Sequence, residues 1–247
     1  MNSTLPLALT FLTKLPWPWR GPADGAALAR SLFWFPWVGA VLGLIFWGAW
    51  AGLQKILPAP AAAALLLTLT VWITGGLHLD GLADTADGLG GGRTPVDALR
   101  IMKDSRVGAF GVISLSLALL LKFSLFLSLA AQPGKTAVLL LYPVLSRWGM
   151  VLLAYLSPYA RAEGGLGQAM TLGVSPRVLS GASLSAGALA LLILGAPGLV
   201  LFGAAAALVW LASLYFQRRL GGITGDVLGA TNEFLEILVL AGALILG

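Results

Sequence analysis

The sequence of 247 residues contains no cysteine and a single histidine, His78. Without cysteine the chain forms neither disulfides nor thiolate metal sites. With one histidine it cannot build the clustered-histidine sites that are typical of zinc enzymes. Carboxylates are therefore the available metal ligands, and their hard oxygens suit Mg²⁺, Ca²⁺ or Mn²⁺.

Charge is also scarce, because only 10% of the residues are charged and 58% are hydrophobic. Soluble domains are usually about 25% charged and about 45–50% apolar. The mean hydropathy of +0.92 therefore indicates an integral membrane protein. Its spans must be helical, because lipid offers no partners to unpaired backbone groups. The net charge of +5 does not indicate nucleic-acid binding, since the basic residues lie at the ends of apolar stretches.

The apolar stretches predict an all-α, polytopic membrane bundle of about seven transmembrane helices. The expected spans are residues 32–53, 61–77, 108–130, 136–157, 179–194, 199–216 and 227–246. The fifth and sixth are separated only by residues 195–198, so they could instead form one long helical hairpin. We expect residues 1–247 to form one integral membrane domain, with a catalytic loop at residues 78–107.

The basic residues are divided unevenly between the two sides of this predicted bundle. Lys55 and Lys135 fall on one side. Eleven residues fall on the other: Lys14, Arg20, Arg30, Arg93, Arg100, Lys103, Arg106, Arg161, Arg177, Arg218 and Arg219. The positive-inside rule therefore predicts that the N-terminus and the 78–107 segment are cytoplasmic.

The acidic residues gather in the same segment. Asp80, Asp84 and Asp87 are spaced i, i+4 and i+7, which places them on one face of a helix. Such carboxylates raise each other's pKa unless a cation neutralises them, so we expect a divalent metal; the alternative is a solvated helix end. The glycines that follow, within residues 88–92, suit either a close approach to phosphate or a flexible loop.

Further charged residues surround this segment or lie within predicted spans. Lys103 and Arg106 are candidate phosphate ligands or membrane anchors. Arg147 lies inside the fourth span and is a functional candidate, or a counter-charge to Glu233 or Glu236. Asp226 is a further candidate carboxylate. Lys122 either has a function or snorkels outward. His78 is a candidate base, a phosphate ligand or a packed residue. A metal with cationic clamps suggests phosphoryl transfer at a membrane face.

Seven blocks of sequence carry a family resemblance. They are FLTKLP (11–16), FPWVGAVLG (35–43), GGLHLDGLADTADG (75–88), MKDSRVGAFG (102–111), SR (146–147), YARAEGGLG (159–167) and GGITGDVLGATNEFLE (221–236). In this order, over nearly the whole length, the chain resembles the cobalamin synthase family, the adenosylcobinamide-GDP ribazoletransferases. Its departures are minor: the family varies between Lys and Arg at position 103 and varies freely at 89–99.

The resemblance implies a late step of cobalamin (vitamin B12) biosynthesis in the bacterial cytoplasmic (inner) membrane. Adenosylcobinamide-GDP and α-ribazole 5′-phosphate, or α-ribazole, would give adenosylcobalamin 5′-phosphate, or adenosylcobalamin, and GMP. Mg²⁺ is the implied cofactor. Membrane lipid is an expected partner and nucleic acid is not; homo-oligomers and complexes with other enzymes of the pathway are left open.

From this resemblance we expect two distant acidic segments to converge around metal that grips a diphosphate. The expected metal ligands are Asp80, Asp84, Asp87 and Asp226. The expected phosphate ligands are Lys103, Arg106, Arg147 and Arg161. The base that takes the hydroxyl proton is expected to be Glu233, Asp104 or His78.

Two other functions share features of this pattern. A CDP-alcohol phosphotransferase would also place acids at a membrane face, but its DGxxAR pattern fails, because Asp84 follows where the pattern requires other residues. An ion-coupled transporter would place ionisable groups near the midplane and often show internal repeats, whereas here the acids are predicted near one face.

Overall fold

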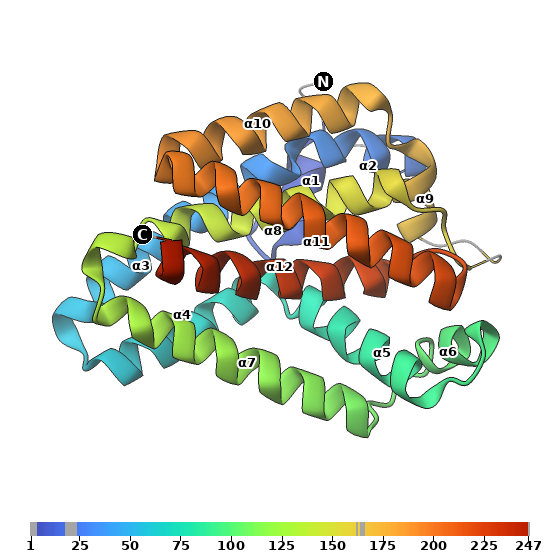
Figure 1. Ribbon diagram of the computed structural model, residues 1–247, viewed down its shortest axis with the longest axis horizontal. Helices are drawn as coiled ribbons and strands as arrows, with labels where there is room; N and C mark the ends of the chain where they lie inside the picture. Colours follow the sequence, from blue (N-terminus) through green and yellow to red (C-terminus); the bar gives the residue numbers. More distant parts are fainter. Residues whose placement is uncertain (1–3, 18–23, 162, 164–165, 247) are drawn as a thin grey trace.

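The computed structural model describes residues 4–17, 24–161, 163 and 166–246; Arg20 of the predicted basic side lies outside these ranges. The described chain is helical apart from turns and one isolated bridge, which confirms the all-α prediction. The helices in Figure 1 are α1 (Leu5–Leu12), α2 (Gly25–Ser31), α3 (Phe35–Ile56), α4 (Ala59–Thr74), α5 (Leu77–Gly91), α6 (Pro95–Ile101), α7 (Ala109–Ala130), α8 (Val138–Leu156), α9 (Leu166–Gly173), α10 (Pro176–Leu194), α11 (Ala196–Leu220) and α12 (Gly225–Leu246), with 3₁₀ turns η1 (Leu32–Trp34) and η2 (Pro133–Lys135).

Six helical segments of the described chain are long and apolar enough to cross a membrane. They are Gly25–Ile56, Ala109–Ala130, Pro133–Leu156, Pro176–Leu194, Ala196–Leu220 and Gly225–Leu246. A seventh span would consist of α4 and α5 together, which meet at an angle of 88°. The expected count of about seven is therefore confirmed as six or seven. The fifth and sixth spans are separate helices that turn at Gly195, whose φ is 64°.

The break between α4 and α5 is formed by two glycines. Gly75 and Gly76 have φ values of 64° and 69°, a left-handed conformation that glycine adopts at little cost. Their N–H groups bond to the carbonyls of Trp72 and Val71, which closes the last turn of α4. The chain then starts a new helix in another direction, so the predicted span 61–77 ends early, at Thr74.

The predicted loop at residues 78–107 is wrong in its structure, because most of it forms α5 and α6. The glycine run lies inside α5 as far as Gly91 and is neither a flexible loop nor an open phosphate cradle. A methyl group on Gly88 would lie 2.9 Å from the Ala98 carbonyl oxygen, so this glycine lets α6 pack closely. Arg219 of α11 donates to the Gly92 carbonyl oxygen at 2.5 Å, where a cation stabilises the end of α5.

Helix α8 is the centre of the bundle, and most of its side chains are buried. Helix α3 approaches it through Gly39 and Gly43, a small residue on each of two successive turns. Methyl groups there would lie 2.7 Å from Val144 Cα and 2.8 Å from Leu140 Cα. Small residues at such contacts let membrane helices pack by close backbone approach.

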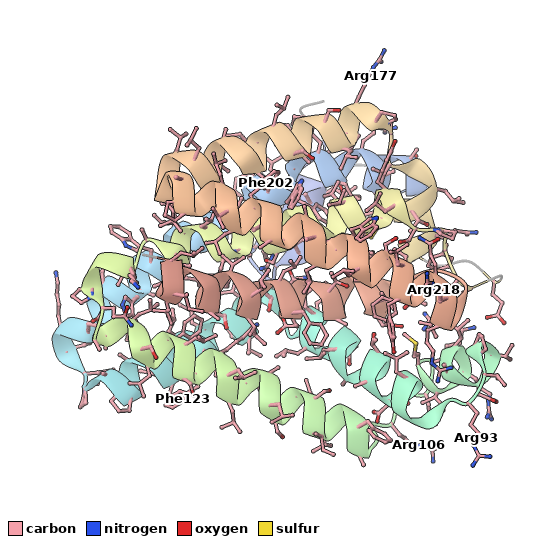
Figure 2. The ribbon with its side chains drawn as sticks, in the orientation of Figure 1. Arg93, Arg106, Phe123, Arg177, Phe202 and Arg218 are labelled. Carbon is pink, nitrogen blue, oxygen red and sulfur yellow. The ribbon has the colours of Figure 1, made fainter. Side chains whose placement is uncertain are left out.

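The two ends of the bundle differ in charge. Figure 2 shows Arg93, Arg106 and Arg218 at the end formed by α5, α6 and the C-terminus of α11. The turn between α7 and α8 lies at the other end, near the C-terminus of the chain (Figure 1). Lys135 in that turn donates to the Leu244 carbonyl oxygen at 2.5 Å. Lys135 thus lies at the end opposite to Arg93, Arg106 and Arg218, as the sequence predicts.

Candidate functional site

Helices α5 and α12 cross at a contact between backbones. A methyl group on Gly81 would lie 2.7 Å from the Asp226 carbonyl oxygen, and one on Gly229 would lie 3.2 Å from His78 Cα. Because glycine has no side chain, the two helices approach closely enough to bring Asp80 beside Asp226. The predicted convergence of the two distant acidic segments is therefore confirmed.

A short bridge sets the position of Arg161. The loop after α8 pairs with the turn before α12: the Ala160 N–H donates to the Ile223 carbonyl at 2.9 Å, and the Ile223 N–H donates to the Pro158 carbonyl at 2.9 Å. The next residue, Arg161, then donates from Nη2 to Asp226 Oδ2 at 2.7 Å. This ion pair links the loop after α8 to the first turn of α12.

Two cavities adjoin this crossing. The first cavity, of about 570 Å³, lies among the N-terminal segment, the α4–α5 break, α5 and α7, and its polar lining includes Lys14, Asp80, Asp84 and Ser105. The second cavity, of about 300 Å³, lies between α5, α12 and the loop after α8, and its polar lining includes His78, Asp80, Lys103, Arg161 and Asp226. Asp80 lines both cavities, so one carboxylate stands where they meet.

Two buried polar atoms of the second cavity lack partners among the described residues. They are His78 Nε2 and Arg161 Nε. Burying a polar group without a hydrogen bond costs about 1–3 kcal/mol, so such atoms point to a ligand that completes them. Imidazole and guanidinium groups both bind phosphate oxygens.

The acidic residues fit Mg²⁺ only if the ligand supplies oxygens as well. Among the residues that the structure describes, no three histidine or acidic side chains form a metal site by themselves. Mg²⁺ is usually held by one or two carboxylates, waters and substrate phosphates. Asp80 and Asp84, which line the first cavity, fit that arrangement, and Asp226 lines the second cavity with Asp80, bound to Arg161.

Asp87, expected as a metal ligand, holds the start of α7 instead. Its carboxylate accepts the N–H groups of Gly108 at 2.7 Å and Gly111 at 2.8 Å. The first N–H groups of a helix have no partner within it, and a negative charge there is stabilising. Asp87 lines neither cavity, so the structure gives it the role of a cap for α7, and its assignment as a metal ligand stays a prediction.

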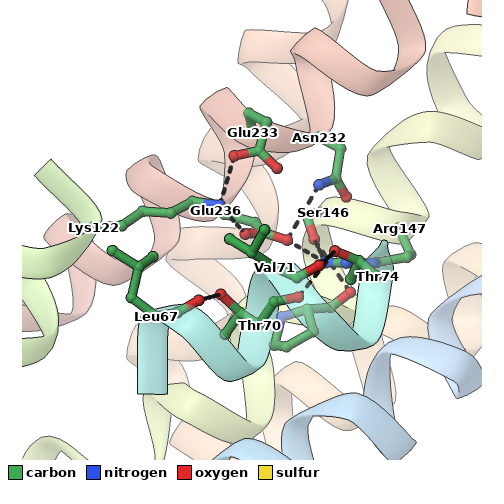
Figure 3. Close-up of polar contacts among 11 residues, drawn as sticks. Leu67, Thr70, Val71, Thr74, Lys122, Ser146, Arg147, Asn232, Glu233 and Glu236 are labelled. Atoms are coloured by element: carbon green, nitrogen blue, oxygen red, sulfur yellow. Dashed lines mark hydrogen bonds and ion pairs between the residues drawn. The ribbon is translucent and has the colours of Figure 1, made fainter. Parts of the chain in front are cut away.

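Four charged side chains form a buried network in the core (Figure 3). Lys122 donates to Glu233 at 2.6 Å and to Glu236 at 2.5 Å. Arg147 pairs with Glu236, which also accepts from Asn232 at 3.1 Å. These residues face a void of only about 10 Å³ and line neither of the two larger cavities. Arg147 is thus the counter-charge to Glu236, Lys122 does not snorkel outward, and Glu233 pairs with Lys122 in the core.

The remaining candidates lie nearer the surface. Asp104 and Arg106 pair with each other at 2.7 Å, with 39% and 86% of their side chains exposed, and neither lines the first or the second cavity. The hydrogen bonds from Arg106 lower the pKa of Asp104 to about 2, which makes Asp104 a weak proton acceptor. Lys103 lines the second cavity and pairs with Glu163.

Comparison with known proteins agrees with the motifs. The family model described as cobalamin-5-phosphate synthase matches residues 4–244. The chain belongs to this family. An adenosylcobinamide-GDP ribazoletransferase of Desulforamulus reducens is 43% identical over 97% of this chain and 95% of that protein. One of Pseudomonas putida strain GB-1 is 46% identical over 96% of each chain. No solved structure gives a significant match.

Membership in the cobalamin-5-phosphate synthase family sets aside both the CDP-alcohol phosphotransferase and the transporter, and it is the family that the motifs predict. Sequence reasoning missed two polar residues of the first cavity, Lys14 and Ser105. From the sequence, Lys14 is only one of the basic residues on the predicted cytoplasmic side. Its place inside the block FLTKLP, which the resemblance includes, was the available signal. Ser105 stands within the block at 102–111.

Proposed function

We propose that this chain transfers the adenosylcobinamide phosphate group of adenosylcobinamide-GDP to α-ribazole 5′-phosphate, or to α-ribazole, with release of GMP. The names of relatives that are 40–46% identical over nearly the whole chain support this proposal. A second support is the pair of polar cavities that share Asp80. Two substrates can then approach one point from two sides, as a displacement at phosphorus requires.

The proposed reaction is a displacement at the phosphorus next to the cobinamide. The ribazole hydroxyl oxygen forms the new bond to phosphorus, the bond to the oxygen that joins the two phosphates breaks, and GMP leaves with that oxygen. Asp80 and Asp84, with Asp226 beside them, would hold Mg²⁺. When bound, Mg²⁺ supplies positive charge to the diphosphate oxygens.

The cations of the second cavity are assigned to the substrate phosphates. Arg161 keeps one edge of its guanidinium on Asp226, and its Nε is left for a phosphate oxygen. Lys103 adds a second cation to the same cavity. Positive groups of this kind stabilise the charge that is spread over the phosphoryl oxygens. Arg106 and Arg147 are not included, because neither lines either of the two cavities.

His78 is our candidate to receive the hydroxyl proton. Among the three bases expected from the sequence, His78 is the one that lines the second cavity, and its buried Nε2 has no partner among the described residues. A base must come within hydrogen-bond reach of the proton that it accepts. Glu233 is enclosed with Lys122, and Asp104 is bound to Arg106, so neither meets that condition.

We also propose that the chain lies in the bacterial inner membrane with the Asp80 cavities open to the cytoplasm. The support is the basic end that carries Arg93 and Arg218, according to the positive-inside rule. Because the chain has no cysteine, single-cysteine variants report orientation directly. In sealed inverted vesicles, a membrane-impermeant maleimide should label Arg93→Cys and not Lys55→Cys; the reverse pattern would reject this orientation.

The decisive experiment is turnover by the purified protein in detergent. With Mg²⁺ and both substrates, the protein should release GMP and form adenosylcobalamin 5′-phosphate, with no ion gradient. Chelation of the metal should stop the reaction, and added Mg²⁺ should restore it. If the folded protein yields no GMP from adenosylcobinamide-GDP, the proposed function is rejected.

A further inference from the structure

Lys14 is held in a defined place although its side chain lies in an open cavity. It follows α1, and its N–H donates to the Ile73 carbonyl oxygen at 2.7 Å, which ties this segment to the end of α4. A methyl group on Gly75 would lie 3.0 Å from Lys14 Cγ. Because Gly75 has no side chain, the α4–α5 break leaves space for the lysine side chain to pass.

The side chain of Lys14 lies in the first cavity together with two carboxylates. Asp80 and Asp84 line this cavity, yet no ion pair of Lys14 occurs within the described ranges. By contrast, Lys103, Lys122 and Arg161 each pair with an acid. The ammonium group is thus available to an anion that enters the cavity.

We infer that Lys14 is a substrate-binding residue that holds a phosphate group of the diphosphate-linked substrate in the first cavity. In this cavity a ligand that carries several phosphate oxygens would meet both the Lys14 ammonium group and the two carboxylates, Asp80 and Asp84, that would hold the metal. Lysine binds phosphate as a compact point charge. This inference rests on the proposed function, and it adds the N-terminal segment to the site.

The competing role for Lys14 is that of a basic anchor at the membrane surface. An anchor acts through charge near the headgroups and leaves substrate affinity unchanged. A phosphate ligand changes the affinity for one substrate more than for the other. The KM values of the two substrates, measured separately, therefore distinguish the two roles.

The first experiment compares Lys14→Met with Lys55→Ala in purified protein. Methionine keeps the apolar stem beside Gly75 and removes the charge. Lys55 is an exposed lysine at the end of α3, so its variant is the matched control. We expect Lys14→Met to raise the KM for adenosylcobinamide-GDP about tenfold or more, since an ionic contact to phosphate is lost, and to change the KM for α-ribazole 5′-phosphate less than twofold. Lys14→Arg should recover part of the loss.

The second experiment uses the unaltered protein and does not depend on how a variant folds. Pyridoxal 5′-phosphate followed by borohydride attaches to exposed lysines, and mass spectrometry locates the labels. Adenosylcobinamide-GDP with Mg²⁺ should protect Lys14 at least about fivefold relative to Lys55, because a bound phosphate covers the amine. The inference is overturned if the substrate protects Lys14 no more than Lys55. It is also overturned if the Lys14→Met enzyme has an unchanged KM for adenosylcobinamide-GDP. If the inference fails in either way while the unaltered enzyme still turns over, only the role of Lys14 is rejected and the proposed function stands.

Discussion

Gly81 of α5 and Asp226 of α12 lie in backbone contact, and a methyl group on Gly81 would stand 2.7 Å from the Asp226 carbonyl oxygen. The two residues are far apart in the sequence. Their contact sets the spacing between the carboxylates of the two helices, since Asp80 is the neighbour of Gly81. The position of the candidate site thus depends on a residue that has no side chain.

This contact predicts that Gly81→Ala separates α5 from α12. Overpacking of this kind costs about 1–3 kcal/mol, and misplacement of the carboxylates should lower kcat/KM about 10- to 100-fold. Thermal unfolding and GMP release measure the two effects. Gly203→Ala in α11 is the matched control, because a methyl group there meets nothing within 4 Å. Wild-type turnover in Gly81→Ala would show that the spacing is not critical.

The carboxylates of the first cavity should be essential. Asp80→Asn and Asp84→Asn each remove a charge that would hold Mg²⁺, so turnover should fall by at least about 100-fold while the protein still inserts into membranes. Asp97→Asn alters an exposed aspartate of α6 that bonds to Thr94, and it should retain activity. Near-normal rates in either cavity variant would reject the metal assignment.

Asp87 should behave as a structural residue. Asp87→Ala leaves the N–H groups of Gly108 and Gly111 without their partner, which should cost about 1–2 kcal/mol of stability. The Mg²⁺ concentration that gives half-maximal activity should stay within about twofold of the wild-type value. A large rise in that concentration, with the melting temperature unchanged, would return Asp87 to the metal site.

The buried network predicts that charge balance matters more than any single pair. Lys122→Met leaves Glu233 and Glu236 with one cation, Arg147, and an uncompensated buried charge costs about 3–5 kcal/mol. Lys122→Met combined with Glu233→Gln restores the balance, so the double variant should be more stable than Lys122→Met alone. Thermal unfolding in detergent of the two single variants and the double variant gives the coupling. Additive losses would contradict this account.

The pH dependence of catalysis should not involve Asp104. Its folded pKa, about 2, lies below the ordinary value of 3.8 because Arg106 donates to the carboxylate. A carboxyl group with a lowered pKa contributes stability above its ordinary pKa, and that stability is lost as the pH falls towards 2. Above roughly pH 5 Asp104 is always ionised. Asp104→Asn should therefore leave the pH profile of kcat/KM unchanged between roughly pH 5 and 9; a lost acidic limb would identify Asp104 as the base.

Helix type and number could be predicted because lipid imposes a simple rule: an apolar stretch of about 20 residues forms a helix. The rule gave no span at residues 78–107, where the stretch is too polar; only the spacing of Asp80, Asp84 and Asp87 indicated a helix there, and the glycines after them indicated a loop. Tertiary packing decides this region. The glycines Gly81 and Gly88 are used for contacts with α12 and α6, which no local pattern reveals.

The sequence by itself determined the membrane class through its composition and the gathering of carboxylates through their local spacing. It also indicated the family, through the resemblance of ordered sequence blocks. Only the tertiary structure decided which charges are free for a ligand. Arg147, Glu233 and Asp87 looked like site residues, yet each is paired with a partner from another part of the fold. Lys14 was one of eleven basic residues on the predicted cytoplasmic side, yet it lines the cavity of Asp80. Whether a charge is paired depends on side chains distant in the sequence, and folding alone brings those together.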